Sequence, residues 1–296
     1  MNYITKATEW AEQGGPTPRE YDDFNEWLAA IAKEVEDGNL DESGINNLRF
    51  AFGEALSTST LQGISLHKPR GYAGDFEVID RVYQRSMTTD PQLLNWDHYL
   101  LNTKAAQAVR NRKDYFLKLV DELENGLSPE QEVTILNIAS GPSRDVFEYL
   151  SQTSDQRIDF DCVEYDQLAI KYATALCFEH LDRVNFLQKN AFRFTTKKRY
   201  PLIWSAGLFD YFDDRQFQFL TSRLLNFLEP GGELVIGNFS DDNPDRAYME
   251  LLMEWELNHR SAAHLTKLAM GCGVDESKIY IGKEPTGVNL FLHIKK

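Results

Sequence analysis

The stretch that decides the fold is Val133-Thr-Ile-Leu-Asn-Ile-Ala-Ser-Gly-Pro-Ser-Arg-Asp145. It begins as a short apolar run rich in β-branched residues, passes through small residues and leads into a segment with helical spacing. This order is typical of a buried parallel strand that feeds a tight turn and then a helix. Such a turn directs free backbone N–H groups at whatever lies above the end of the strand. The stretch therefore predicts a strand–turn–helix unit that binds a ligand.

Beyond this stretch the chain keeps alternating between strand-like apolar runs and helical segments. Strands are predicted near 133–139, 159–164, 184–188, 201–206, 232–238, 278–283 and 289–294, and helices near 143–152, 166–181, 214–228 and 244–270. Such alternation indicates a parallel sheet between two helical layers. The last two strands are joined by Glu284-Pro-Thr-Gly287, which is too short for a crossover helix, so they should pair antiparallel. The expected fold is α/β, a Rossmann-like seven-stranded sheet with an antiparallel C-terminal hairpin.

Residues 1–130 have a different pattern, which is almost wholly helical. Apolar residues recur with helical spacing over 21–35, 43–64, 75–87 and 103–123, and turns rich in glycine and proline separate these segments. Asn125-Gly126 followed by Ser128-Pro129 is the best candidate for a boundary. We therefore expect a helical N-terminal lid or substrate region at 1–130 and a ligand-binding domain at 131–296.

Composition and charge exclude several classes of function. The formal net charge is −15, so a phosphate backbone would be repelled and nucleic acid is not an expected partner. The three cysteines form no C-x-x-C pair and the six histidines lack metal-ligand spacing, so neither a metal site nor a disulfide is expected. No apolar run is long enough to span a bilayer, and the N-terminus has no apolar signal core. These features predict a cytoplasmic globular protein.

Five strings, in order, make residues 131–294 resemble a class I S-adenosylmethionine-dependent methyltransferase domain. The first is Ile135-Leu-Asn-Ile-Ala-Ser-Gly-Pro-Ser143, which resembles the loop beneath the methionine part of the cofactor. It departs from the family pattern, because Asn137 stands where an acid is usual and Ala139 and Ser143 replace glycines. Small residues still permit close approach of the backbone. The resemblance implies cofactor contacts from Asn137, Ala139, Ser140, Gly141 and Pro142.

The second string, Phe160-Asp-Cys-Val-Glu164, ends a predicted strand with an acidic residue. A carboxylate at this position is placed to accept hydrogen bonds from both hydroxyls of a ribose. Tyr165 follows and is expected to pack against the adenosine, while Asp166 should cap the next helix. The alternative is that Glu164 is an ordinary solvent-exposed carboxylate at the end of a strand.

The remaining strings end the third and fourth strands and begin the fifth. Asn190 and Ala191 stand where the family reads the adenine amino group, although Asn190 is also suited to a simple loop. Ser205, Ala206 and Gly207 end the fourth strand and should face the reacting methyl group. Leu228-Glu-Pro-Gly-Gly-Glu-Leu-Val-Ile236 resembles the turn before the fifth strand. A dinucleotide oxidoreductase would need G-x-G-x-x-G, which the sequence lacks.

The helical half carries the string Lys68-Pro-Arg-Gly-Tyr-Ala-Gly-Asp75. Together with the first motif it resembles a bacterial subgroup that includes proteins assigned to the synthesis of 3-hydroxy fatty-acid methyl esters used as cell-density signals. This resemblance implies a fatty-acyl carboxylate as the methyl acceptor. A carboxylate needs no general base, so catalysis would be mainly positioning, which can lower a barrier by ~7–11 kcal/mol. The alternative is a tight loop in which Asp75 caps a helix.

The sequence also suggests residues that act on the acceptor. Tyr72, Asp75 and Arg260 are the candidate catalytic residues, and Tyr211, Trp255 and His259 are the candidate substrate contacts. Arg260, Arg70 or Arg112 could hold a carboxylate, and Tyr72, Asp75 or His259 could serve as a base for a phenol or amine.

Other functions are compatible with the same motifs. The glycine-poor first motif also suits a non-catalytic protein that binds S-adenosylmethionine for regulation. An O- or N-methyltransferase acting on another small metabolite is a second alternative, and a protein or RNA methyltransferase is a third. The acidic composition argues against RNA. The leading interpretation is a methyltransferase with S-adenosylmethionine as cofactor, S-adenosylhomocysteine as product and a small molecule as acceptor. A homodimer is compatible with this interpretation.

Overall fold

The computed structural model describes residues 3–296, which form two compact units. The first unit runs to Gln107 and also contains Asn243–Glu256, and the second contains Ala108–Asp242 and Leu257–Lys296. The division therefore lies earlier than the boundary expected at 130/131, and one later segment belongs to the first unit. The reason is helix α7 (Lys104–Gly126), whose residues Phe116 and Val120 are buried in the core of the second unit.

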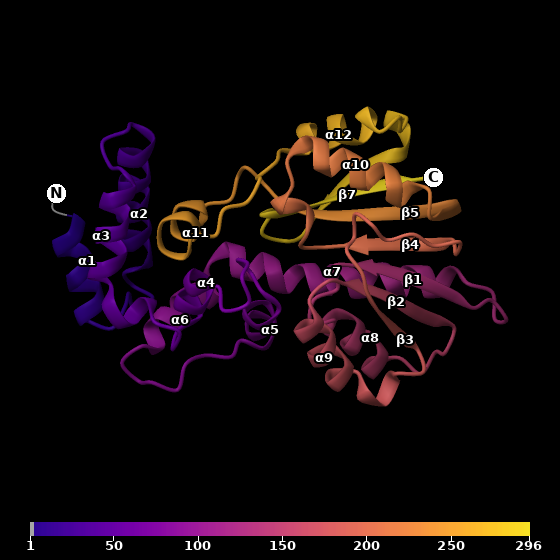
Figure 1. Ribbon diagram of the computed structural model, residues 1–296, viewed down its shortest axis with the longest axis horizontal. Coiled ribbons are helices and arrows are strands. Elements are labelled where there is room, and N and C mark those ends of the chain that lie inside the picture. The colour runs from indigo at the N-terminus through magenta and orange to yellow at the C-terminus, as the bar shows by residue number, and fades with distance from the viewer. Residues whose placement is uncertain (1–2) are drawn as a thin grey trace. The chain divides into compact units, whose positions relative to one another are not determined.

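The first unit is helical. Aromatic rings fill its core; the ring of Phe24, for example, packs edge-on against those of Trp10 and Tyr99. The hydroxyl of Tyr248 donates a hydrogen bond of 2.7 Å to Oε1 of Gln62, and both side chains are buried. Its elements are α1 (Tyr3–Glu12), α2 (Tyr21–Glu36), α3 (Glu42–Ala51), η1 (Gly53–Leu56), α4 (Leu61–His67), α5 (Phe76–Gln84), α6 (Leu94–Asn102) and α11 (Arg246–Met253) (Figure 1).

Two helices that the sequence pattern predicted as continuous are broken. The segment 43–64 divides into α3, η1 and α4, because Gly53 has a left-handed φ of 50° and Thr60 starts a new helix by accepting a hydrogen bond from the Gly63 amide. The segment 244–270 divides into α11 and α12 (Ala262–Gly271). Glu254, with φ 47°, ends α11, and the Ser261 side chain caps α12.

The second unit contains the predicted seven-stranded sheet, in the order β3-β2-β1-β4-β5-β7-β6. Strands β1 to β5 pair in parallel, and β7 runs antiparallel to both β5 and β6. The expected α/β architecture with an antiparallel C-terminal hairpin is confirmed. The strands are β1 (Val133–Ile138), β2 (Ile158–Glu164), β3 (Val184–Gln188), β4 (Tyr200–Ser205), β5 (Leu228–Phe239), β6 (Ile279–Lys283) and β7 (Asn289–Lys295).

Helices cover both faces of this sheet (Figure 1). Alternate residues of β1 face opposite layers, so Ile135 packs in the core with α7 and α8, while Leu136 packs in the core with α10 and α12. Burying each such side chain contributes ~1.5–3 kcal/mol, which fixes the register of the strands. The remaining elements are α8 (Arg144–Gln152), α9 (Gln167–Leu176), η2 (Phe178–His180), η3 (Phe209–Tyr211), α10 (Asp214–Leu225) and η4 (Glu276–Lys278).

The strand order identifies the edge of the sheet where a ligand should bind. The chain moves outward from β1 to β2 and β3, and then returns to the other side of β1 as β4. In open α/β sheets ligands bind outside the carboxyl ends of the strands at the point where this direction reverses. The candidate site therefore lies at the ends of β1 and β4. Within residues 3–296, no helix combines the length and apolar character needed to cross a membrane.

Candidate active site

The turn that follows β1 has an unusual backbone. Ala139, Gly141 and Ser143 all have positive φ angles, of 55°, 53° and 50°. The left-handed conformation costs a residue other than glycine ~1–2 kcal/mol, and such strain is concentrated at functional sites. A Cβ atom placed on Gly141 would meet no atom within 4 Å. The space beside this turn is therefore open to a ligand.

The polar side chains of the turn have different surroundings. The Ser140 side chain is buried, and its Oγ has no hydrogen-bond partner in residues 3–296. Leaving a buried polar group without a partner costs ~1–3 kcal/mol, so this hydroxyl is suited to a ligand. The side-chain amide of Asn137 instead lies 3.3 Å from Oδ2 of Asp145 and is used inside the protein. Pro142 is buried beside them.

Glu164 lies where the sequence pattern predicted, at the end of β2 beside the open turn. Its Oε2 accepts a hydrogen bond of 2.9 Å from the Gly141 amide. Its Oε1 accepts from the amides of Tyr165, at 2.7 Å, and Asp166, at 2.9 Å. A carboxylate has about four lone-pair sites, so these three bonds leave capacity for a hydroxyl group. Tyr165 is 72% exposed and is free to cover a bound ring, while Asp166 caps α9 as predicted.

The residues after β3 and β4 are used partly for structure. Oδ1 of Asn190 accepts a hydrogen bond of 2.9 Å from the Phe192 amide, which is the loop-ordering role named as the alternative, and Ala191 is half-buried. The Ser205 hydroxyl donates to the carbonyl of Ile138 at 3.1 Å. The Ser205 hydroxyl is thus used inside the protein, whereas the exposed Asn190 orders its own loop.

Arg112, on α7, approaches the end of β4 closely. Its Nη1 donates a hydrogen bond of 3.1 Å to the carbonyl of Ala206, and a Cβ atom on Gly207 would lie 3.2 Å from the same nitrogen. Burial raises the pKa of Asp145, and the positive charge of Arg112 acts in the opposite direction. The sequence pattern named Arg112 only as a possible carboxylate holder, because its neighbours on β4 are far away in the chain.

Asp210, in η3, is a buried acid that was not among the predicted site residues. Its Oδ1 accepts a hydrogen bond of 2.6 Å from the amide of Phe239 at the end of β5. Burial raises the pKa of Asp210 to about 6, and the Phe239 amide, Arg112 and Arg260 limit that rise. The available signal was a single acid between aromatic residues, in Leu208-Phe-Asp-Tyr-Phe212, directly after a strand.

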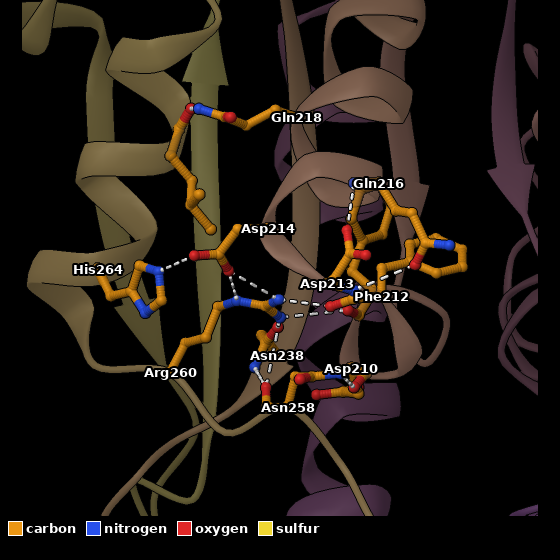
Figure 2. Close-up of polar contacts among 12 residues, drawn as sticks. Asp210, Phe212, Asp213, Asp214, Gln216, Gln218, Asn238, Asn258, Arg260 and His264 are labelled. Atoms are coloured by element: carbon orange, nitrogen blue, oxygen red, sulfur yellow. Dashed lines mark hydrogen bonds and ion pairs between the residues drawn. The ribbon is translucent and has the colours of Figure 1, made fainter.

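The structure gives Arg260 a different role from the predicted contact with an acceptor. The side chain is buried, and Figure 2 shows it extended between Asp214 and the carbonyl of Phe212. Nε donates to Asp214 at 3.1 Å, Nη1 to Oδ1 of Asn238 at 2.8 Å, and Nη2 to the Phe212 carbonyl. Its guanidinium also lies 4.9 Å from the centre of the Phe217 ring. Through these hydrogen bonds Arg260 links the end of η3 to α10 and β5.

The other predicted residues are divided between the units. Asp75 caps α5 through Oδ1, which accepts from the amides of Glu77 and Val78, as the alternative interpretation expected. Its Oδ2 is buried without a hydrogen-bond partner in residues 3–296, and burial raises its pKa. The first unit also contains Tyr72, which is exposed, and Trp255, which is half-buried; the second contains Tyr211, which is exposed, and His259, which is half-buried.

The chain matches a family model described as "Putative methyltransferase" over residues 26–266. The chain belongs to this methyltransferase family. No curated protein matches it. The expected enzyme class is therefore confirmed.

Solved structures share the fold at low sequence identity. A possible exported protein from Bordetella parapertussis is 18% identical, with a TM-score of 0.67, and the match covers 99% of this chain and 94% of that one. The CurJ carbon methyltransferase is 12% identical, with a TM-score of 0.58 and coverage of 99% and 90%. Magnesium protoporphyrin IX methyltransferase (ChlM) from Synechocystis PCC 6803, solved with bound S-adenosylhomocysteine, is 9% identical, with a TM-score of 0.53 and coverage of 80% and 99%. These similarities confirm the Rossmann-like fold of the methyltransferase.

Proposed function

We propose that this methyltransferase transfers the methyl group of S-adenosylmethionine to a small-molecule acceptor. The observation that carries the proposal is the Glu164 carboxylate, which lies 2.9 Å from the Gly141 amide beside an open turn. This arrangement supports a ribose site, because the carboxylate oxygens lie next to a backbone that a ligand can approach closely. The buried Ser140 hydroxyl, which has no partner in residues 3–296, also fits a polar ligand at this turn.

Each residue of the site has a definite proposed task. The remaining lone pair of Glu164 accepts a hydrogen bond from a ribose hydroxyl, and the exposed ring of Tyr165 covers the adenosine. Arg112 supplies a buried positive charge for the carboxylate of the methionine part. Bound S-adenosylmethionine supplies an activated methyl group, and the protein positions it. Well-aligned reactants can lower a barrier by ~7–11 kcal/mol without further chemistry from the protein.

The acceptor is proposed to be a small metabolite. The carboxylate of a 3-hydroxy fatty acid is the acceptor that the Lys68-Pro-Arg-Gly-Tyr-Ala-Gly-Asp75 string implies by resemblance. A hydroxyl, phenol or amine of another metabolite is the second candidate. The raised pKa of the buried Asp210 favours it, because such an acid is suited to take up the proton of the acceptor. The helical first unit is proposed as the substrate region, with Tyr72, Asp75 and Trp255 as its contacts. We also propose a cytoplasmic location and a homodimer, and sedimentation velocity of the purified protein tests the latter.

Calorimetry with S-adenosylmethionine and S-adenosylhomocysteine tests the proposal directly. Both should bind, and Glu164→Ala should weaken binding at least tenfold, or about 1.4 kcal/mol. Glu179→Ala, an exposed glutamate of η2, is the matched control and should bind like the native protein. Unchanged affinity in Glu164→Ala would show that the ribose assignment is wrong. Failure of the folded native protein to bind either ligand at millimolar concentration would end the proposal.

A further inference from the structure

Asp210 is held in place from three directions. Its Oδ1 accepts the hydrogen bond from the Phe239 amide, and its backbone carbonyl accepts from the amide of Asn258, at 2.7 Å, and from the Asn258 side chain, at 3.2 Å. Arg260 is bonded to Asn238, beside Phe239, and to the carbonyl of Phe209, beside Asp210. Figure 2 shows Asp210 and Asn258 grouped next to this arginine. The carboxyl group is therefore positioned by η3, β5 and the segment after α11 together.

The Asp210 carboxyl group keeps unused hydrogen-bonding capacity. Within residues 3–296, its donors are the Phe239 amide, which reaches Oδ1, and its own backbone amide, and the residue is only 2% exposed. A carboxylate oxygen in such surroundings normally has a donor, because an unmet acceptor is costly. A bound molecule can therefore supply this carboxyl group with a further hydrogen-bond donor.

Burial allows Asp210 to lose and gain a proton near neutral pH. Burial raises its pKa to about 6, while Arg112 on α7 and Arg260 favour the ionised form. The charge of Arg260 is itself balanced by Asp214, which also faces His264 at 2.7 Å. A general base works best when its pKa lies close to the working pH, and Asp210 meets this condition.

The sheet order places Asp210 on the acceptor side of the proposed cofactor. Strands β2, β1, β4 and β5 lie side by side, with ~4.8 Å between neighbours. Glu164 ends β2 and Gly141 follows β1, so a cofactor held by both extends toward β4. Asp210 follows β4, and its carboxylate reaches the amide at the end of β5. The methyl group would then be presented toward the side where Asp210 lies.

We propose that Asp210 accepts the proton that the methyl acceptor gives up, and that the acceptor is accordingly a hydroxyl, phenol or amine rather than a carboxylate. This inference rests on the proposed function and specifies the substrate class of the same site. The lone pair of the acceptor oxygen or nitrogen forms a bond to the methyl carbon as the carbon–sulfur bond breaks. The electrons of that bond stay on sulfur, giving neutral S-adenosylhomocysteine. The acceptor proton passes to Oδ2 of Asp210 and then to water.

Transfer of a tritiated methyl group tests the acceptor class without prior identification of the acceptor. The protein is incubated with methyl-labelled S-adenosylmethionine and a protein-free bacterial metabolite extract, and the product is treated with alkali. Methyl esters release volatile methanol, whereas N-methyl groups and ethers keep the label. We expect alkali-stable label. Release of the label as methanol would overturn the proposal.

The Asp210→Asn variant tests the role of the residue itself. Transfer should fall by about 100-fold or more, because a general base contributes 10²–10⁴-fold, while the affinity for S-adenosylhomocysteine stays the same. The native rate should decline as the pH falls through about 6, where Asp210 becomes protonated. Asp210→Glu keeps a carboxyl group and should retain both partial activity and this decline. Asp213→Asn, which changes the exposed capping residue of α10, is the matched control and should be fully active.

The remaining outcomes separate the two proposals. Equal loss of S-adenosylhomocysteine binding and activity in Asp210→Asn would overturn the acceptor role and assign the residue to the cofactor or to folding. If Asp210→Asn fails to fold, the native protein still tests the proposal. A rate that does not decline as the pH falls through about 6, or label released by alkali, would then overturn it. Cofactor binding without any labelled product would contradict both proposals. Absence of cofactor binding in the native protein would refute the proposed function, and the inference with it.

Discussion

The hydroxyl of Ser205 donates a hydrogen bond to the carbonyl oxygen of Ile138, with 3.1 Å between the two oxygen atoms. Ile138 ends β1 and Ser205 ends β4, and both are fully buried. The bond thus joins the two strands between which the direction of the sheet reverses. This hydrogen bond supports the edge of the sheet on which the proposed cofactor lies. The Ser140 hydroxyl, in contrast, has no hydrogen-bond partner in residues 3–296.

Ser205→Ala should destabilise the protein. The change leaves the carbonyl of Ile138 buried without its side-chain donor, so the free energy of unfolding should fall by ~1–3 kcal/mol. Urea denaturation measures this loss. Its effect on the affinity for S-adenosylhomocysteine should be smaller than that of Glu164→Ala. A Ser205→Ala protein as stable as the native one would show that the bond does not support the sheet.

Ser140→Ala should have the opposite pattern. It removes a buried hydroxyl that has no partner, so the stability of the ligand-free protein should stay constant or rise. Loss of a hydrogen bond to the ligand should nevertheless weaken S-adenosylhomocysteine binding by ~0.5–1.5 kcal/mol. Urea denaturation and calorimetry on the same preparation separate the two effects. Unchanged affinity would remove Ser140 from the proposed site.

Tyr165→Ala should weaken cofactor binding without affecting stability. The ring is 72% exposed, so its removal costs little packing, but stacking of a base on an aromatic ring contributes ~1–3 kcal/mol. Tyr165→Phe keeps the ring and should bind normally. Phe178→Ala, which removes an aromatic ring that is 74% exposed, is the matched control. Calorimetry with S-adenosylhomocysteine that showed equal affinities for Tyr165→Ala and Phe178→Ala would disprove the contact.

Arg260→Lys should unfold far more easily than the native protein. A lysine cannot reproduce the planar set of donors that reaches Asp214, Asn238 and the Phe212 carbonyl. Breaking a buried network of this kind costs ~3–5 kcal/mol, which urea denaturation would detect. Native stability combined with a raised KM for the acceptor would instead restore the role first predicted for Arg260.

Asp210→Asn should stabilise the protein more at pH 7.5 than at pH 4. The pKa of Asp210 is about 6 in the folded protein against an ordinary value of 3.8, so the folded state binds the proton more tightly. Its contribution to stability is therefore present at low pH and is lost as the pH rises from about 4 to 6. The shift corresponds to about 3 kcal/mol at most. Urea denaturation at both pH values checks the sign, and a stabilisation that does not change with pH would contradict it.

Local patterns in the sequence predicted most of the second unit. Alternating apolar runs identified the strands, and the short Glu284–Gly287 link identified the terminal hairpin. The boundary of the units was not predictable, because α7 looks like the helices before it and its packing on the sheet depends on distant strands. The breaks at Gly53 and Glu254 depend on single residues with left-handed backbones, which periodicity does not detect.

The site was predictable only where its residues lie at the ends of recognisable strands. Glu164 and Gly141 could be placed together because Glu164 ends β2 and Gly141 lies in the turn after β1. Arg112 and Asp210 could not, because Arg112 contacts Ala206 after β4 and Asp210 contacts Phe239 at the end of β5, and these partners are distant in the chain. Arg260 was predicted as a catalytic residue, and its structural partners Asp214, Asn238 and Phe212 could not be predicted because they lie on segments distant in the chain.

The first unit is assembled from two separate pieces of chain, since Asn243–Glu256 belongs with the residues up to Gln107. Dissection of the enzyme by a single cut is therefore unsuitable. A fragment starting at residue 131 would lack the α7 side chains that pack against one face of the sheet. It would also keep α11, which belongs to the first unit, without the helices of that unit. A free-standing catalytic half would have to start near residue 104 and replace 243–256 with a short linker.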